Sequence, residues 1–195
     1  MTTCCDRAKL KPLTTNHPLN NGSFMKAVFA SLLALALFAF AAHADVTVKI
    51  NGVHLCCQKC VNGVNKAIET VPGVTAVVDQ DASTVTLTGP DTATLQKAAD
   101  ALTGAGYYGI SADDSVKLSS ATGATGAKVS TLTVSGVHLC CGKCIKALNE
   151  ALATVPGVTT NTAVKGAKSF QVAGNFTDTD VFTALQKIGL TGKVQ

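Results

Sequence analysis

Cysteine, histidine and lysine recur in two nonapeptides of this chain, GVHLCCQKC at residues 52–60 and GVHLCCGKC at residues 136–144. Thiolate sulfur is a soft ligand that selects soft metal ions, with Cu(I) first and Zn(II) or Hg(II) as alternatives. Three cysteines and a histidine also make a donor set that suits zinc. The two nonapeptides therefore predict metal binding. The candidate ligands are Cys56, Cys57, Cys60 and His54 in the first, and Cys140, Cys141, Cys144 and His138 in the second.

The two nonapeptides belong to a longer internal repeat. They lie 84 positions apart, from residue 52 to residue 136, and the same offset relates VPGV at 71–74 to VPGV at 155–158. A fixed offset that carries a motif and a turn together indicates a duplicated structural unit.

The position of each cysteine motif before a helix favours ionised thiols. Two cysteines separated by two residues can turn toward one ion when their loop runs into a helix. The first turn of that helix presents unpaired N–H groups and a partial positive charge, which favour thiolate over thiol. Lys59 and Lys143, inside the two motifs, can offset the negative charge of a Cu(I) bis-thiolate.

Hydrophobic periodicity predicts the elements that position these motifs. In the first repeat it indicates strands at 46–50, 74–78, 85–87 and 107–112, and helices at 61–71 and 95–102. The second repeat has the same order, with strands at 132–134, from 158, at 170–172 and at 190–194, and helices at 145–155 and 181–188. The order β-α-β-β-α-β is that of a ferredoxin-like unit with an antiparallel sheet.

The predicted fold is therefore α+β, with two tandem ferredoxin-like domains at residues 45–112 and 129–195. Each has fewer than 70 residues, so its core must be small. The segment between them, residues 113–128, is rich in Ser, Gly, Ala and Thr, which predicts a flexible linker.

Each repeat resembles the heavy-metal-associated domain, in which a strand ends in Gly and a Cys-x-x-Cys loop precedes a helix that ends in Val-Pro-Gly-Val. That domain occurs in soluble copper chaperones, mercury-binding periplasmic proteins and the N-terminal arms of metal-pumping ATPases. With Cys60 as the anchor, the apolar positions from Val61 to Val74 fall where the family has its own, and Ala105-Gly106-Tyr107 is similar to the family's Gly-aromatic segment. The resemblance covers both repeats and implies two metal-binding pairs, Cys57 with Cys60 and Cys141 with Cys144.

The chain departs from the family pattern in the loop before the motif. The family has a Met and one further residue between the Gly and the first cysteine, whereas Val-His-Leu-Cys separates Gly52 from Cys57. Cys56 and His54 have no family counterpart, and Leu190 stands in the second repeat where the first has Tyr107. We expect Cys57 and Cys60 to be the obligatory pair and Cys56 to be an auxiliary ligand.

The start of the chain predicts export. From Met25 a lysine, an apolar run and Ala42-His43-Ala44 form the three parts of a secretory signal peptide, residues 25–44, cleaved before Asp45. The apolar run is shorter than the roughly 20 residues of a membrane-spanning helix. Residues 1–24 are polar, and we interpret them as upstream of the true initiator Met25, which would remove Cys4 and Cys5. The expected location is periplasmic or secreted, with no membrane association after cleavage.

Composition narrows the class of function. From Asp45 onward 12 lysines face 11 acidic residues, Arg7 is the only arginine, and there is no Trp. Without a basic stripe or stacking aromatics, nucleic-acid binding is disfavoured. No Ser-His-Asp set, carboxylate pair or phosphate-binding Gly loop stands out, so we expect no enzymatic activity. The expected role is Cu(I) buffering and transfer, with a metal-donor or metal-acceptor protein as partner.

Two other classes of function remain open at this point. One is a thiol-disulfide redox protein that uses Cys57-Gln-Lys-Cys60, since the expected compartment is oxidising. The other is a structural or interaction protein whose cysteines are oxidised. Free thiols together with bound metal in natively isolated protein would favour metal binding over both.

Overall fold

The computed structural model describes residues 44–195, and these residues belong to one compact unit. Cys4, Cys5 and all of the predicted signal peptide except residue 44 lie outside the described residues. Within the part of the chain that the structure describes, no helix is long and apolar enough to cross a membrane.

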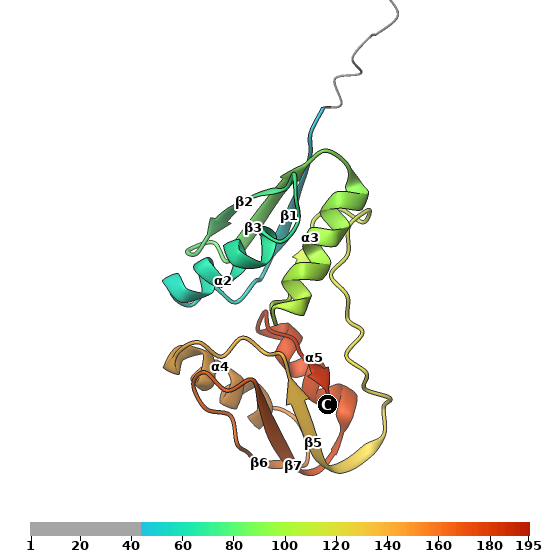
Figure 1. The fold of residues 1–195 in the computed structure, drawn as a ribbon. Coiled ribbons are helices and arrows are strands. Elements are labelled where there is room, and N and C mark those ends of the chain that lie inside the picture. Colours follow the sequence, from blue (N-terminus) through green and yellow to red (C-terminus); the bar gives the residue numbers. More distant parts are fainter. Residues whose placement is uncertain (1–43) are drawn as a thin grey trace, which may run out of the picture. The chain divides into compact units, whose positions relative to one another are not determined.

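The first half of this unit, residues 46–111, contains one four-stranded sheet and two helices (Figure 1). Its strands are all antiparallel and follow the order β2-β3-β1-β4 across the sheet. The elements are β1 (Val46–Asn51), α2 (Gln58–Ile68), β2 (Thr75–Asp79), β3 (Thr84–Gly89), α3 (Thr92–Gly104) and β4 (Ile110–Ser111).

The second half, residues 128–194, repeats this arrangement, with the strand order β6-β7-β5-β8. Its elements are β5 (Lys128–Ser135), α4 (Gly142–Ala153), β6 (Val158–Asn161), β7 (Ser169–Thr177), α5 (Asp178–Lys187) and β8 (Lys193–Val194). The predicted α+β class with antiparallel sheets is confirmed, and both halves show the predicted order of elements.

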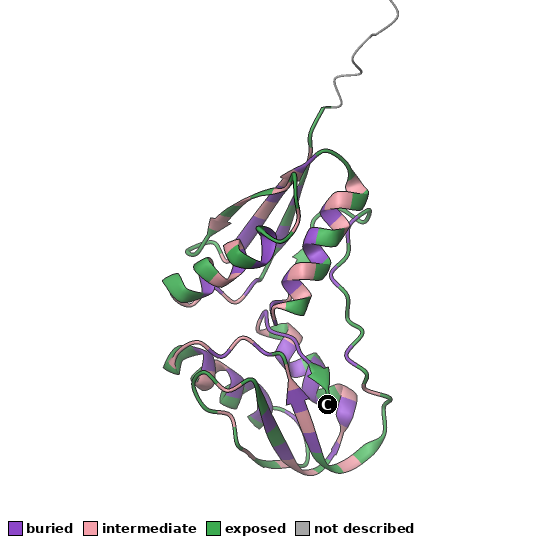
Figure 2. Cartoon of the chain, in the orientation of Figure 1, coloured by how far each residue is buried: buried purple, intermediate pink, exposed green. Residues whose placement is uncertain are grey.

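The alternating burial of β1 explains why each sheet needs a helical layer. Val48 and Ile50 are buried, whereas Thr47, Lys49 and Asn51 between them are exposed, so only one face of the sheet is covered. Figure 2 shows buried and exposed positions interleaved along the helices and strands of both halves. The buried stripes that cover the sheets are Cys60, Val64, Ala67 and Ile68 on α2, and Cys144, Leu148, Ala151 and Leu152 on α4.

The last strand of each half is shorter than the sequence predicts. Only Ile110–Ser111 pair with β1, and only Lys193–Val194 pair with β5. Tyr107 instead forms an isolated antiparallel bridge with Leu190. The predicted strand at 107–112 is therefore divided, because its first residues pair with the other half of the unit.

The segment at 113–128, for which composition predicts a flexible linker, is attached at several points. Val116 and Leu118 are buried among the core residues. The side chain of Gln96 on α3 donates to the carbonyl oxygen of Lys117 and accepts from its N–H, at 2.8 and 2.9 Å. Two apolar residues at alternate positions thus dock a stretch that is otherwise small and polar.

Candidate metal centre

The six cysteines of the two nonapeptides converge in one cluster. Their sulfurs make contacts of 3.5–4.0 Å with one another, both within and between the two halves. All six are free thiols. Cys60 and Cys144 are buried and the other four are half-buried. The structure therefore brings all six predicted cysteine ligands together.

The Cys-x-x-Cys spacing places each pair at the start of a helix. Cys57 and Cys141 are the N-cap residues of α2 and α4, in extended conformation, and Cys60 and Cys144 lie in the first turn. The Cys60 N–H donates to the carbonyl oxygen of Cys57 at 2.8 Å. Because this turn is the positive end of the helix, thiolates on it are stabilised.

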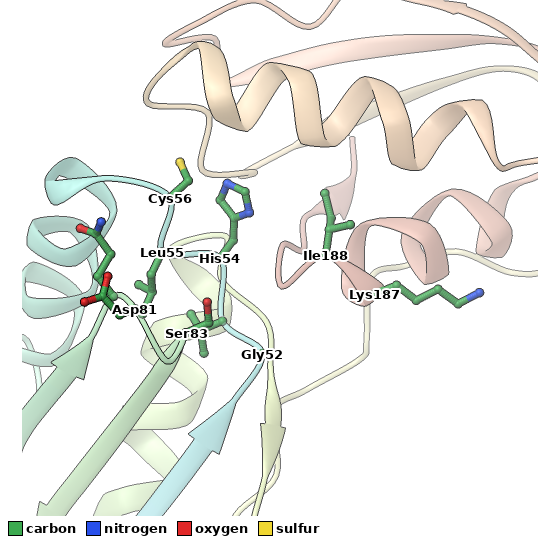
Figure 3. Close-up of a pocket in the computed structure, with 10 residues that line it drawn as sticks. Gly52, His54, Leu55, Cys56, Asp81, Ser83, Lys187 and Ile188 are labelled. Atoms are coloured by element: carbon green, nitrogen blue, oxygen red, sulfur yellow. The ribbon is translucent and has the colours of Figure 1, made fainter.

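The longer loop before each pair alternates buried and half-buried residues, and this directs the remaining ligands. Val53 and Leu55 are 1% and 3% exposed, so they anchor the loop in the core. His54 and Cys56, which alternate with them, therefore project to the opposite side, and Figure 3 shows both extending in the same direction from the loop after β1. The Val-His-Leu-Cys alternation was a signal of this arrangement already present in the sequence.

The histidines differ in their surroundings. A ring nitrogen of His54 lies within 4.8 Å of the Cys56 and Cys144 sulfurs. The His138 ring stacks on Tyr107, with centroids 4.6 Å apart and an interplanar angle of 28°. Burial lowers the pKa of His138, which favours its neutral form. Among the described residues, Nε2 of each histidine is buried without a hydrogen-bond partner, so each retains a donor or acceptor position for a ligand.

Tyr107 contacts the backbone that carries the cysteine cluster, a role that the sequence did not reveal. It is fully buried, and its hydroxyl donates to the carbonyl oxygen of Cys60 at 2.9 Å. A Cβ at Gly63 would collide with this hydroxyl and would lie 2.9 Å from Cε1 of His138, so only a glycine fits at this position. The second repeat has Ala147 and Leu190 at the corresponding positions. The difference between the repeats at these two positions was the signal in the sequence that could have identified the role of Tyr107.

Two glycines allow the halves to approach each other. Gly106 and Gly189 both have positive φ, and a Cβ on them would collide with the carbonyl oxygens of Gly136 and Gly52 respectively. The close approach permits backbone hydrogen bonds between the halves. Tyr108 N–H donates to the Gly189 carbonyl at 2.9 Å, and Thr191 N–H donates to the Gly106 carbonyl at 3.0 Å.

The thiols differ in acidity because they share hydrogen bonds. Burial raises the pKa of the Cys57 thiol, but hydrogen bonds from the Cys60 N–H and the Cys140 thiol outweigh burial and lower that pKa to about 7. A hydrogen bond from the Cys60 thiol lowers the pKa of Cys144. Burial raises the pKa of Cys56, and raises that of Cys140 to about 12. Metal binding to the whole set must therefore release protons.

Two hollows lead to the cluster from outside. One, of about 460 Å³, lies beside the loop at 52–56 and includes Lys187 and Ile188 from the end of α5 (Figure 3). The other, of about 410 Å³, lies beside the loop at 136–140. Cys56 is one of the residues that line the first hollow, and Cys140 is one of those that line the second.

Comparison with known proteins finds a family likeness over part of the chain. Residues 47–108 match the heavy-metal-associated domain. This match includes His54, Cys56, Cys57 and Cys60, together with the supporting Tyr107. No protein with a curated description gives a significant sequence match.

A solved structure with a detectable likeness is the solution structure of the N-terminal soluble domains of Bacillus subtilis CopA. The identity is 17%, over 78% of this chain and 95% of that chain, and the TM-score is 0.29. The heavy-metal-associated domain at 47–108 and the convergence of cysteines together indicate a heavy-metal-binding centre.

Proposed function

We propose that this protein is an exported, non-enzymatic Cu(I)-binding protein that buffers copper and hands it to a partner. It consists of two tandem heavy-metal-associated domains, of which the second corresponds to the half at 128–194. The observation that carries the proposal is the convergence of six free thiols on the start of α2 and α4. The family match over 47–108 supports it.

The chemistry of the donor set favours a soft ion. The groups of described residues that could hold a metal contain only cysteine sulfur and histidine nitrogen, without a carboxylate. Hard cations such as Mg²⁺ and Ca²⁺ prefer oxygen ligands. Thiolates favour Cu(I), with Zn(II) and Hg(II) as competitors.

Transfer to a partner proceeds by ligand exchange without a change of oxidation state. A thiolate of the partner forms a new Cu–S bond, one Cu–S bond to this protein breaks, and the released sulfur takes up a proton. The hollow beside Cys56 lets a partner approach this cysteine from outside. Repetition of the exchange moves the ion while it remains bound to sulfur throughout.

The test is an anaerobic competition titration of the reduced chain with Cu(I) against a calibrated chelator, followed by the same titration with Zn(II). We expect Cu(I) to be withdrawn from the chelator at a fixed stoichiometry. The control carries Cys57→Ser, Cys60→Ser, Cys141→Ser and Cys144→Ser, and should lose this binding. Equal competition by parent and control would reject the proposal.

A redox role is the second candidate, because sulfurs 3.5 Å apart need only a small movement to reach the roughly 2.05 Å of a disulfide. Native isolation distinguishes the two functions. Copper bound to free thiols supports metal binding, whereas protein that reduces or oxidises a model disulfide substrate catalytically, with no bound metal, supports the redox role.

A further inference from the structure

The sulfur contacts divide into two triangles, and each triangle draws on both halves. In the first, Cys56 lies 3.5 Å from both Cys141 and Cys144, which are 3.7 Å apart. Each triangle edge is thus a direct contact. The first cysteine of the first nonapeptide therefore completes the Cys-x-x-Cys pair of the second half.

The second triangle is the reciprocal of the first. Cys140 lies 3.6 Å from Cys57 and 3.5 Å from Cys60, which are 4.0 Å apart. The first cysteine of the second nonapeptide thus completes the pair of the first half.

Three further contacts join the two triangles corner to corner. They are Cys56–Cys60 at 3.6 Å, Cys57–Cys141 at 3.8 Å and Cys140–Cys144 at 3.7 Å. The six sulfurs are therefore the corners of a trigonal prism. A sulfur at any corner is close enough to the other triangle to bridge two ions.

The size of the triangles suits three-coordinate ions. With a metal–thiolate bond of about 2.3 Å, a planar three-coordinate ion needs sulfurs about 4.0 Å apart, and a linear two-coordinate ion needs about 4.6 Å. The triangle edges of 3.5–4.0 Å are nearer to the first value. Neither Cys-x-x-Cys pair is spaced for a linear ion.

We propose that the six cysteines form one shared multi-copper centre in which Cys56 and Cys140 cross between the halves. Cys56 is the third ligand of Cys141 and Cys144, and Cys140 is the third ligand of Cys57 and Cys60. The centre holds at least two Cu(I) ions, one on each triangle, and the joining contacts let sulfurs bridge further ions. This proposal rests on the Cu(I)-binding function proposed above.

The fold explains why the crossing ligands are held in place. Tyr107 and Leu190 bridge the halves directly behind the cluster. The buried Val53 and Leu55 anchor the loop that presents Cys56. The added length of this loop, relative to the pattern of the heavy-metal-associated family, therefore has a function, which is to carry a ligand across to the other half.

Charge favours a centre with several ions. Six thiolates carry a formal charge of −6, and each Cu(I) removes one unit. The Nζ of the exposed Lys143 donates to the Cys56 carbonyl in the cluster loop at 3.5 Å. The adjacent helix termini supply only partial charges, so once metal has displaced the thiol protons, each additional Cu(I) offsets the charge of one thiolate.

A different set of three would keep each site within one half. The sulfurs of Cys56, Cys57 and Cys60 also lie within 4.8 Å of one another. The two arrangements predict opposite effects for the same substitutions, which makes them separable by experiment.

The experiment uses the full chain with Cys4→Ser and Cys5→Ser, so that only the six described cysteines remain. A first background adds Cys141→Ser and Cys144→Ser, which leaves the Cys57–Cys60 pair. In this background Cys140→Ser should weaken Cu(I) binding at least tenfold in chelator competition, whereas Cys56→Ser should change it less than threefold. X-ray absorption should report three sulfur ligands before Cys140→Ser and fewer afterwards.

The mirror background carries Cys57→Ser and Cys60→Ser instead, and protects the test against misfolding of one variant. Here Cys56→Ser should weaken binding and Cys140→Ser should not. The opposite pattern in both backgrounds, or equal insensitivity to both substitutions, would overturn the crossed centre and leave Cu(I) binding intact. Loss of Cu(I) binding in the unsubstituted six-cysteine parent would instead reject the proposed function.

Discussion

Gly189→Ala tests whether the contact between the halves assembles the cluster. Gly189 has φ of 77°, where an alanine costs about 1–2 kcal/mol. Its Cβ would also collide with the Gly52 carbonyl oxygen, so the loop at 52–54 must move away. That movement breaks the hydrogen bond that the His54 N–H donates to the Gly189 carbonyl, at 3.2 Å. Such a bond contributes about 0.5–1.5 kcal/mol.

The matched control is Gly126→Ala. Gly126 has φ of 81°, but a Cβ there meets nothing within 4 Å. The control therefore carries the cost of the positive φ without the collision. The difference in unfolding free energy between the two variants isolates the contact between the halves, and the lost hydrogen bond sets it at about 0.5–1.5 kcal/mol.

Urea unfolding of both variants measures this difference, and Cu(I) titration measures its effect on the centre. We expect Gly189→Ala to lower the number of tightly bound Cu(I) ions, because Cys56 is displaced from Cys141 and Cys144. Gly126→Ala should bind copper like the parent. If Gly189→Ala is no less stable than Gly126→Ala and retains the parental stoichiometry, the close approach of Gly189 to the loop at 52–54 does not hold the cluster together.

Three further predictions follow from other parts of the chain. Tyr107→Phe should lower stability to urea by about 0.5–1.5 kcal/mol, because it removes the hydrogen bond from the buried hydroxyl to the Cys60 carbonyl; an unchanged midpoint would contradict this role. The Asp178 carboxylate accepts hydrogen bonds from the N–H groups of Thr125 and Gly126, and these bonds lower its pKa. Its contribution to folding stability is therefore present above the ordinary pKa of 3.8 and is lost as the pH falls through the lowered pKa. Asp178→Asn should therefore lower stability at pH 7 by about 1–3 kcal/mol, and this difference from the parent should shrink as the pH falls below 3.8, as measured by urea unfolding over that range. Mass spectrometry of the exported protein should show Asp45 as its first residue, and an intact Met1 would contradict the predicted processing.

Local features of the fold could be predicted because they depend on residues close together in the chain. The apolar stripe after Cys60 predicts a helix, and α2 buries Val64, Ala67 and Ile68 on that stripe. The Cys-x-x-Cys motif is likewise predicted to lie where a loop runs into a helix, and Cys57 is the N-cap residue of α2. The candidate ligands were therefore identifiable by type, although their role in metal binding stays a prediction.

The arrangement of those ligands could not be predicted in the same way. Tyr107 reads as an ordinary packing residue until the structure shows its hydroxyl on the Cys60 carbonyl and its ring on His138. The alternation in Val-His-Leu-Cys indicates that Cys56 leaves the core, but it does not indicate what Cys56 meets.

The sequence by itself determined the element order of each half, the helix-start position of each cysteine pair and the soft character of the donor set, since these follow from local periodicity and residue chemistry. Only the tertiary structure decided that six sulfurs form one cluster. That outcome depends on the approach of Gly106 and Gly189 to loops more than 25 residues distant in the chain. The space that their missing side chains leave brings Cys56 to Cys144 and Cys140 to Cys60, a contact that no periodicity within either repeat can encode.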